Sequence, residues 1–386
     1  MALLSAKSYQ LKARVIGIDA SRAFLKRRTG IEEYSYQVIK HLRDTLSSDA
    51  QIVLYVRKKF SFVEGRLQMS IPEIDFELPR NWTVRALWAP RFWTQLALSL
   101  EMLWRAPDVL FVPAHTVPII HPKKTVVTIH GLEYEFCPGA YSLWERIYMH
   151  YSIKFSCRVA STVICVSENT KRDVMAFYRV MEEKIAVISE GYEQTRSMNQ
   201  EAGNMSEKKK PYLLFIGRLE ERKNIVRIVE AFELLKEKYQ IPHKLVLVGK
   251  AGFRYERIRD YIQHSAFNIH IRELGYVTEE EKWELLRNAD VFLFPTLYEG
   301  FGIPVLEAQS VRVPVVTSNT SSLPEVAGEG AVLVDPTSVE SIADGVQKLL
   351  SDQGLRSGII EKATHNVSRY SWARCAREVG RLLRRQ

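Results

Sequence analysis

The sequence predicts an α/β protein of two domains, each built around a parallel β-sheet. Its 386 residues are enough for two domains of ordinary size. Short apolar runs typical of buried parallel strands alternate with helical patterns in both halves; RVIGID at 14–19 and YLLFIG at 212–217 are examples. A polar stretch with three successive lysines lies between the halves. We therefore expect domains over 1–190 and 212–369, joined by a linker over 191–211.

The elements expected in each half follow from the spacing of apolar residues. Strands are predicted in the first half at 14–19, 51–56, 108–113, 125–130, 161–166 and 184–189, with helices at 31–43, 144–155 and 168–178. Strands are predicted in the second half at 212–217, 244–249, 268–275, 291–294, 313–318 and 331–335, with helices from 225, at 278–290, 338–350 and 370–383. Ser167 and Thr278 are predicted N-caps, and Glu281 completes a capping box with Thr278.

Composition indicates a globular protein of the cytoplasm. The hydrophobic content of 46% and the charged content of 26% are ordinary, and no apolar run reaches the ~20 residues of a membrane span. The N-terminus lacks the apolar core of a signal peptide, so none is expected. The four cysteines show no metal-ligand spacing and are expected to be reduced thiols: Cys137, Cys157, Cys165 and Cys375.

The formal net charge of +9 suggests an anionic partner. Basic clusters occur at 26–28, 57–59, 208–210 and near the C-terminus, but no nucleic-acid-binding motif accompanies them, so nucleic acid is not expected. Peripheral contact with an anionic membrane on its inner face, or an anionic acceptor, fits better. A soluble surface that is simply basic explains the charge equally well.

Aromatic and arginine residues mix between 81 and 105, a composition that suits a bilayer interface. Residues 91–104 have helical periodicity, which an ordinary amphipathic helix packed on the first domain also explains. The aromatic loop from Trp82 to Trp88 is therefore the better candidate for membrane contact.

The segment 291–309 predicts a ligand site. A buried strand leads through Gly300 and Gly302 into a helix with Pro304 in its first turn, so the glycines let the backbone approach a ligand and N–H groups face outward. Glu299 lies in the loop and Glu307 about one turn into the helix. Carboxylates so placed can accept hydrogen bonds from sugar hydroxyls. A plain βα turn with a capping glutamate is the alternative.

A second cluster follows the strand that ends at Gly217. Arg218 can grip phosphate oxygens in bidentate fashion, and Lys223 adds a point charge at a helix start. Gly249 ends the next strand and is expected to face the same crevice, since ligands of open parallel sheets bind beyond the carboxyl ends of strands. The same rule places His115 and His130, which follow two strands of the first half, at a crevice.

The spacing of Glu299 and Glu307 with GFGIP after the first resembles the signature of glycosyltransferase family 4, among the group 1 hexosyltransferases. The run from Gly217 to Asn224 resembles the same family's phosphate-binding motif. The resemblance covers nearly the whole chain. It implies the GT-B fold, with two Rossmann-like domains that face each other across a cleft and a last helix, 370–386, that crosses back to the first domain.

The resemblance also implies roles for individual residues. Glu299 and the loop residues after it would contact the donor sugar, Glu307 the nucleotide ribose, Val277 the base, and Arg218 and Lys223 the diphosphate. His130 would lie close to the donor sugar. The donor-binding set is then Gly217, Arg218, Lys223, Gly249, Val277, Glu299, Gly300, Phe301, Gly302, Ile303 and Glu307, with Gly30 and His115 on the acceptor side.

Two departures from the family pattern affect these roles. After Thr29-Gly30-Ile31 the mannosyltransferase-like branch has Gly-Arg-Tyr, whereas this chain has Glu32-Glu33-Tyr34. After the strand that leads to His130 the family has Asp, whereas this chain has Gly131.

The predicted reaction is transfer of a hexose from a nucleotide sugar to a glycan or lipid-linked acceptor, with retention of configuration. No Asp-x-Asp motif occurs in a suitable loop, so no metal and no cofactor are expected; Arg218, Lys223 and loop amides would stabilise the leaving diphosphate. Mannose from GDP-mannose is favoured by resemblance, and a UDP-sugar remains open. The alternatives are a nucleotide-sugar 2-epimerase and an inactive membrane-associated scaffold.

Overall fold

The computed structural model describes residues 13–25, 28–46, 49–63, 66–89, 91–192 and 211–386. Lys26, Arg27, the lysines at 208–210 and nearly all of the predicted linker lie outside the described residues. The chain forms two compact units. One comprises residues up to 128 with 159–163 and 376–386, and the other comprises 129–158 and 164–375.

The first half of the chain forms a seven-stranded sheet in the order β5-β2-β1-β6-β7-β8-β9. The pairs β1–β2, β1–β6, β2–β5 and β6–β7 are parallel. The boundary between the two units passes through β7 and β8. The strands are β1 (Arg14–Asp19), β2 (Ala50–Arg57), β5 (Trp82–Leu87), β6 (Val109–Val112), β7 (Thr125–Ile129), β8 (Thr162–Cys165) and β9 (Ile185–Val187).

Helices and one hairpin accompany this sheet. The antiparallel hairpin consists of β3 (Lys59–Val63) and β4 (Arg66–Ser70). The helices are α1 (Gly30–Leu42), η1 (Thr94–Leu98), α2 (Ser99–Arg105), α3 (Glu133–Phe136), η2 (Pro138–Ala140), α4 (Leu143–Val159), α5 (Glu168–Tyr178) and η3 (Glu182–Lys184). The predicted N-cap of α5 is confirmed, because Ser167 Oγ accepts a hydrogen bond from Thr170 N.

The second half forms a six-stranded sheet in the order β12-β11-β10-β13-β14-β15, and every paired neighbour is parallel. This is the doubly wound order in which the direction of winding reverses beside the first strand. The strands are β10 (Tyr212–Ile216), β11 (Lys244–Val248), β12 (Ile271–Gly275), β13 (Val291–Phe294), β14 (Val315–Ser318) and β15 (Val332–Val334).

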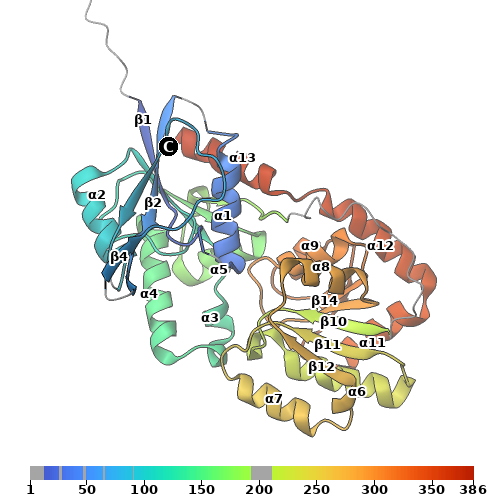
Figure 1. Ribbon diagram of the computed structural model, residues 1–386. Helices are drawn as coiled ribbons and strands as arrows, with labels where there is room; N and C mark the ends of the chain where they lie inside the picture. Colours follow the sequence, from blue (N-terminus) through green and yellow to red (C-terminus); the bar gives the residue numbers. More distant parts are fainter. Residues whose placement is uncertain (1–12, 26–27, 47–48, 64–65, 90, 193–210) are drawn as a thin grey trace, which may run out of the picture. The chain divides into compact units, whose positions relative to one another are not determined.

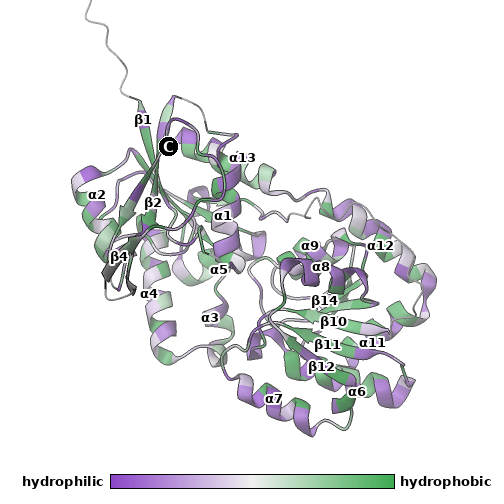
Figure 2. Cartoon of the chain, in the orientation of Figure 1, coloured by the Kyte–Doolittle hydropathy of each residue, from purple (hydrophilic) through white to green (hydrophobic). Residues whose placement is uncertain are grey.

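Helices cover both faces of the six-stranded sheet; in Figure 1, α8 and α9 lie on one side of it and α6 and α7 on the other. Hydrophobic residues concentrate on its strands (Figure 2), where stacked rings of Phe292, Phe294 and Phe215 fill the core. The helices are η5 (Glu221–Lys223), α6 (Ile225–Tyr239), α7 (Tyr255–His264), η6 (Asn268–His270), α8 (Glu279–Arg287), α9 (Ile303–Ser310), α10 (Leu323–Ala327), α11 (Val339–Ser351), α12 (Gln353–Val367) and α13 (Trp372–Arg385).

Residues 376–386 at the end of α13 belong to the first unit. Arg14 Nη1 donates to the carbonyl of Arg384 over 2.8 Å, and Arg384 in turn donates to the carbonyl of Thr45. Gly380 packs beside Leu42 and Thr45 of the α1 end.

The structure differs from the sequence predictions at several places. The strand predicted from 268 begins at Ile271, because η6 occupies the first three residues. The predicted aromatic loop from Trp82 to Trp88 is largely strand β5; Trp82 is buried in it, and Trp88, which follows the strand, is exposed. All four cysteines are free thiols, as predicted. Among the described residues, no helix combines the length and the apolar character needed to cross a membrane.

Candidate functional site

The two predicted ligand motifs follow neighbouring strands at the point where the winding of the six-stranded sheet reverses. Gly217 and Arg218 come directly after β10, and the loop with Glu299 follows β13, which pairs with β10. Ligands of such sheets bind beyond the carboxyl ends of the strands at this point. The structure therefore brings the two motifs together, as the sequence predicts.

Glu299 is the centre of a buried ion-pair cluster. Its Oε1 lies 2.5 Å from Lys223 Nζ and 3.1 Å from Arg222 Nη1. Arg222 also donates to Glu220 Oε1 over 2.9 Å and to the carbonyl of Tyr298 over 3.0 Å. Charges buried this way are tolerated only when they are paired and hydrogen-bonded.

The environment of this cluster keeps Glu299 ionised. Burial alone would raise the pKa of its carboxyl, but Lys223 and Arg222 outweigh burial and hold that pKa below the usual range. Burial lowers the pKa of the Lys223 ammonium, although Glu299 opposes that shift. Burial would also lower the pKa of Arg222, but Glu299, with nearby Glu133, raises it overall. The cluster thus holds a permanent guanidinium beside a carboxylate.

Arg222 was missed by the sequence analysis, which assigned the charge work to Arg218 and Lys223. Arg218 is instead largely exposed, and its Nε lies 4.0 Å from Glu220 Oε2. Arg218 and Arg222 lie in the same short charged turn, and no local pattern in the sequence identifies Arg222 as the buried arginine. Asn224 completes the turn: it has φ 63° and its Nδ2 donates to the carbonyls of Pro295 and Pro336.

The loop before α9 presents backbone N–H groups. Within the described part of the chain, the N–H groups of Gly300, Phe301 and Gly302 have no protein acceptor. The loop carbonyls are satisfied by Ser322 Oγ, which bonds to those of Glu299 and Phe301 over 2.9 and 2.7 Å. Unpaired N–H groups at a helix start suit an anionic or polar ligand group.

Gly300 lies directly against the segment that carries His130. A Cβ on residue 300 would be 1.5 Å from the carbonyl oxygen of His130, so only glycine fits there. The carbonyl of Gly300 accepts hydrogen bonds from Ser167 Oγ over 2.7 Å and Thr170 Oγ1 over 3.2 Å. The start of α5 therefore fixes the glycine loop, a contact that sequence reasoning did not predict.

Further contacts reinforce this junction. Tyr298 OH donates to Asp173 Oδ2 over 2.6 Å and accepts from Leu132 N over 3.2 Å, and its ring stacks on Phe136 at 4.6 Å between centroids. Glu325 accepts from the N–H groups of α5 at Glu168 over 3.0 Å. The loop after β7 and the loop after β13 are thus held together through buried polar bonds.

His130 is oriented by a carboxylate. Its Nδ1 lies 2.8 Å from Glu190 Oε1, and both side chains are buried. Because an ionised carboxylate only accepts, this bond places the proton of the ring on Nδ1. Glu190 follows β9, sixty residues from His130, and was not among the predicted site residues.

Glu133 occupies the place that a side chain at position 131 would take. A Cβ on Gly131 would lie 2.9 Å from Glu133 Oε2 and 3.1 Å from the Cα of Gly300. Glu133 is half-buried, and within the described residues its carboxylate makes no hydrogen bond or ion pair. The departure from the family's Asp at 131 therefore coincides with a carboxylate supplied from two residues later.

Glu307 points to a different cation. Lys282 Nζ lies 2.9 Å from Glu307 Oε1 and 2.7 Å from Glu279 Oε2. Burial would lower the pKa of Lys282, but Glu307 and Glu279 raise it above its usual range. Glu307 is mostly buried, so this pairing fixes its position beside the first turns of α9. Thr278 caps α8 with Glu281 in the predicted capping box.

The remaining predicted donor-side residues lie at strand ends of the same sheet. A Cβ on Gly249 would be 1.8 Å from the carbonyl oxygen of Gly217, so these two backbones touch after β10 and β11. Val277 follows β12 and is partly buried against the core. Ile303 is the first residue of α9.

The two predicted acceptor-side residues, Gly30 and His115, belong to the first unit. Gly30 opens α1 with φ 35°, and Glu32 caps that helix by bonding to Thr29. The second departing glutamate, Glu33, pairs with Arg28 over 2.9 Å. Both glutamates therefore have local structural partners. His115 follows β6 and is buried.

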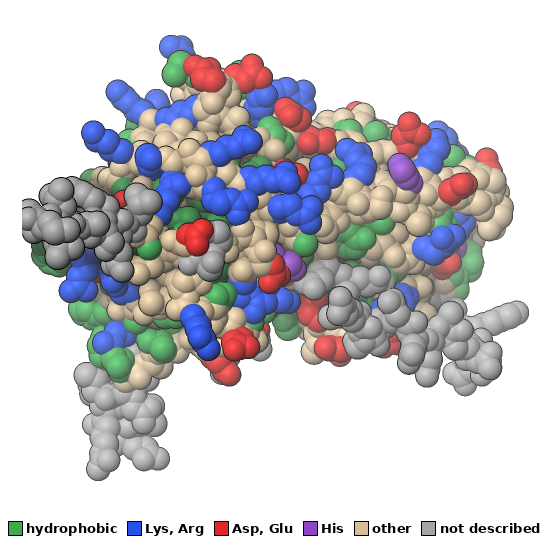
Figure 3. Space-filling view, turned by 90° about the horizontal axis from the view of Figure 1, so that it is seen from above, with side chains coloured by type: hydrophobic (Ala, Val, Ile, Leu, Met, Phe, Trp, Pro, Cys, Tyr) green, Lys and Arg blue, Asp and Glu red, His purple; other side chains and the backbone are tan. Residues whose placement is uncertain are grey.

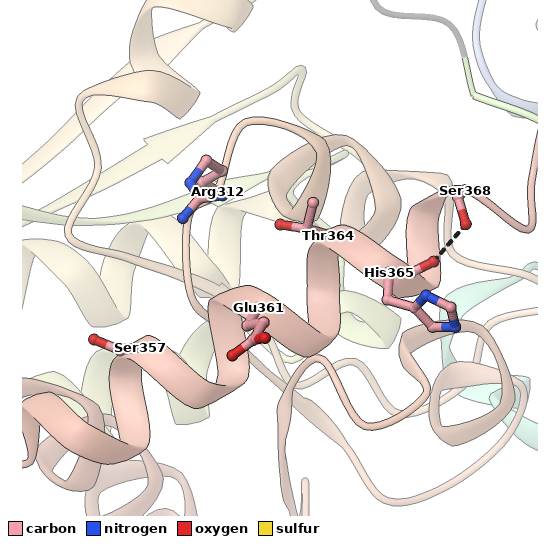
Figure 4. A pocket seen from close by; sticks show the side chains of 6 residues that line it. All are labelled: Arg312, Ser357, Glu361, Thr364, His365 and Ser368. Atoms are coloured by element: carbon pink, nitrogen blue, oxygen red, sulfur yellow. Dashed lines mark hydrogen bonds between the residues drawn. The ribbon is translucent and has the colours of Figure 1, made fainter.

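An open pocket of about 610 Å³ lies elsewhere, on α12 (Figure 4). Ser368 Oγ donates to the carbonyl of His365 at its edge over 2.7 Å. The pocket contains none of the motif residues, and we assign it no function. No group of three or more His, Cys, Asp or Glu side chains that could hold a metal ion occurs among the residues described. The pocket is lined by Arg312, Ser357, Glu361, Thr364, His365 and Ser368.

Comparison with known families matches both halves of the chain. Residues 28–196 match the family described as Glycosyltransferase Family 4, and residues 198–366 match Glycosyl transferases group 1. The O-antigen chain mannosyltransferase B of Escherichia coli is 30% identical over 262 residues, which are 66% of this chain and 68% of that protein. The O-antigen chain mannosyltransferase RfbU of Salmonella typhimurium is 23% identical over 366 residues, 93% and 96% of the two chains.

Solved structures confirm the GT-B fold. WaaG, a glycosyltransferase involved in lipopolysaccharide biosynthesis, superposes with a TM-score of 0.71 at 14% identity, over 96% of this chain and 99% of that one. Anabaena Alr3699/HepE, solved in complex with UDP and glucose, superposes with a TM-score of 0.68 at 16% identity, over 97% and 100% of the chains.

Proposed function

Because the chain belongs to glycosyltransferase family 4, we propose that it transfers a mannosyl residue from GDP-mannose to a glycan or lipid-linked acceptor, with retention of configuration. The Glu299–Lys223–Arg222 cluster beside unpaired loop N–H groups is the observation that carries this proposal. The named mannosyltransferase relatives support the choice of sugar. A UDP-sugar is the alternative donor, since HepE was solved with UDP and glucose.

The site residues divide the work by charge. The bond between the anomeric carbon and the diphosphate oxygen breaks, and its electron pair goes to that oxygen. Arg218, whose side chain is exposed, and the loop N–H groups stabilise the growing negative charge. The acceptor hydroxyl attacks the anomeric carbon from the face that the diphosphate leaves, and its proton passes to a phosphate oxygen. No protein nucleophile and no metal take part in these steps.

Glu299 and Glu307 recognise the donor. The ionised Glu299 carboxylate accepts hydrogen bonds from sugar hydroxyls, while Lys223 and Arg222 hold it in place. Glu307, held by Lys282, accepts hydrogen bonds from the ribose hydroxyls. His130, oriented by Glu190, positions the sugar rather than moving protons.

The enzyme acts in the cytoplasm, in peripheral contact with the inner face of the membrane that carries its acceptor. The net charge of +9 supports contact with an anionic surface. Lys and Arg side chains are spread widely over the face drawn in Figure 3.

A thermal-shift panel of GDP, UDP, ADP and their sugars tests the proposal, because a ligand of the folded state raises its stability. We expect a selective rise of Tm with GDP and GDP-mannose. A selective response to UDP would keep the site and reassign the sugar. No response to any nucleotide would instead favour an inactive scaffold. In a separate activity assay, turnover of the donor without acceptor would favour an epimerase.

A further inference from the structure

The outer face of η1 and α2 is apolar along its whole length. Five apolar residues that are 46 to 72% exposed follow one another at intervals of one to four residues: Phe92, Leu96, Leu100, Leu103 and Trp104. Residues spaced by three or four share one face of a helix. We call this set, with the two isoleucines described below, the η1–α2 face.

The opposite side of the same helices is anchored in the first unit. Trp93, Leu98 and Met102 are buried, and Trp93 Nε1 donates to the carbonyl of Leu87 over 3.1 Å. The helices are therefore ordered by their inner side. The outer apolar residues do not pack in the core. Exposed apolar patches of this kind mark interaction sites.

A neighbouring loop extends the face. Gln95 Nε2 donates to the carbonyl of Val117 over 3.3 Å, and Gln95 Oε1 accepts from Ile119 N over 3.1 Å. Ser99 Oγ accepts from Ile120 N over 3.4 Å. These bonds hold Ile119 and Ile120 beside the helices, with side chains 65% and 37% exposed.

Charges around the face are positive. Arg91 and Arg105 are exposed at its two ends, and the exposed Lys123 and Lys124 follow the isoleucine loop. Glu101 is the one acidic residue between positions 91 and 105, and it is mostly buried and paired with Arg85. The face is thus apolar in the middle and cationic at its rim.

We propose that the η1–α2 face docks on an anionic phospholipid bilayer. Apolar and aromatic side chains enter the boundary between headgroups and acyl chains, and flanking arginines and lysines meet the lipid phosphates. A second copy of the chain is a poorer occupant, because it would bring its own cationic rim against this one. The inference deepens the membrane contact proposed above and names the surface that makes it.

Sedimentation with phosphatidylcholine vesicles, with and without phosphatidylglycerol, tests this proposal without any sugar nucleotide. We expect binding to the anionic vesicles that weakens at high salt. The double variant L100Q/L103Q should bind about tenfold more weakly, because two apolar leucine side chains are no longer transferred from water into the bilayer. R91Q/R105Q should bind anionic vesicles about thirtyfold more weakly, because two cations no longer meet the lipid phosphates.

The matched control is I269Q/L355Q, which removes two exposed aliphatic side chains from the second unit. It should bind as the wild type does, and all variants should keep the wild-type Tm. Equal vesicle binding by L100Q/L103Q and wild type would overturn the proposal. So would a failure of the wild type to bind, or a dimer in solution that L100Q/L103Q dissociates without changing vesicle binding. Because no donor is present, these outcomes are independent of the thermal-shift result.

Discussion

The backbone of Gly300 lies against the carbonyl oxygen of His130, and no side chain fits between them. A Cβ on residue 300 would be 1.5 Å from that oxygen. Two loops that belong to strands far apart in the sequence therefore share one surface, and the glycine loop's conformation depends on a partner outside its own motif.

Substitution of Gly300 by Ala should destabilise the protein strongly. The methyl group would force the two loops apart and break the bonds of Ser167 and Thr170 to the Gly300 carbonyl. We expect a loss of about 3 kcal/mol or more in the free energy of unfolding, measured by urea denaturation. Gly358 is the control: it lies in α12 with open space around it, so G358A should be neutral or stabilising. Equal stability of G300A and wild type would contradict this packing.

Substitution of Glu299 by Gln should destabilise the protein in a pH-dependent way. The pKa of Glu299 is lower in the folded protein than its usual value of 4.5. Its stabilising contribution is therefore fully present above pH 4.5 and is lost as the pH falls through the folded value. At neutral pH, E299Q leaves Lys223 beside Arg222 without their carboxylate, at a cost of about 3–5 kcal/mol.

Urea midpoints of E299Q and wild type, measured from neutral to acidic pH, check this prediction. The difference between the two proteins should stay constant through the neutral range and shrink in acid. A difference that stayed the same into strong acid would show that Glu299 is not the ionised partner of Lys223 and Arg222.

Substitution of Glu307 by Gln should weaken donor binding about tenfold, a loss of about 1.4 kcal/mol. The amide can accept fewer hydrogen bonds from the ribose and no longer holds Lys282 by charge. E279Q is the matched control, since it removes the other carboxylate bound to Lys282 but leaves Glu307 in place. Titration calorimetry with GDP and UDP measures both. If E279Q weakened binding as much as E307Q, the loss would come from the disturbed position of Lys282 and not from a contact of Glu307 with the ribose.

Substitution of Glu133 by Gln should lower kcat/KM about tenfold while Tm stays unchanged. Its carboxylate accepts no hydrogen bond among the described residues, lies beside Gly131 and Gly300, and can therefore accept one from a substrate hydroxyl. E135Q provides the contrast: Glu135 bonds to His150, so its loss should lower Tm more than turnover. Wild-type kcat/KM in E133Q would remove Glu133 from the site.

Chelation by EDTA should leave the rate of transfer unchanged, because Arg218 and the loop N–H groups are expected to stabilise the leaving diphosphate without a cation. The initial rate with and without EDTA, and after addition of Mg²⁺, measures this. Activity that EDTA abolishes and Mg²⁺ restores would refute the metal-free reaction.

The sequence predicted the fold well because parallel strands are apolar runs that need no distant partner to be recognised. Strands such as 212–216 and 291–294 lie where the pattern places them. The spacing of apolar residues was a less reliable guide to which side chains are exposed. The aromatic segment that begins at Trp82 was expected to be a loop, whereas residues 82–87 form β5 and Trp82 is buried.

The candidate site was predicted as far as its residues lie in two short motifs. Glu299, Lys223 and Gly300 were found because a strand end, a glycine and a charge occur close together in the sequence. Glu190 and Ser167 were not, because each meets its partner across a long stretch of chain: Glu190 bonds to His130 and Ser167 to Gly300. Lys223 was expected to add a point charge for the diphosphate at a helix start, and the structure pairs its buried ammonium with Glu299.

The hold of Ser167 and Thr170 on Gly300 bears on how hybrid enzymes of this kind should be designed. An exchange of donor halves at the junction near residue 211 would pair a glycine loop from one parent with an α5 start and a His130 loop from another. Even a single side chain at position 300 in the incoming half would collide with the retained His130 carbonyl. A hybrid that carries residues 129–190 together with the donor half keeps both hydroxyls and the carbonyl they bind, so donor specificity should travel with that longer segment.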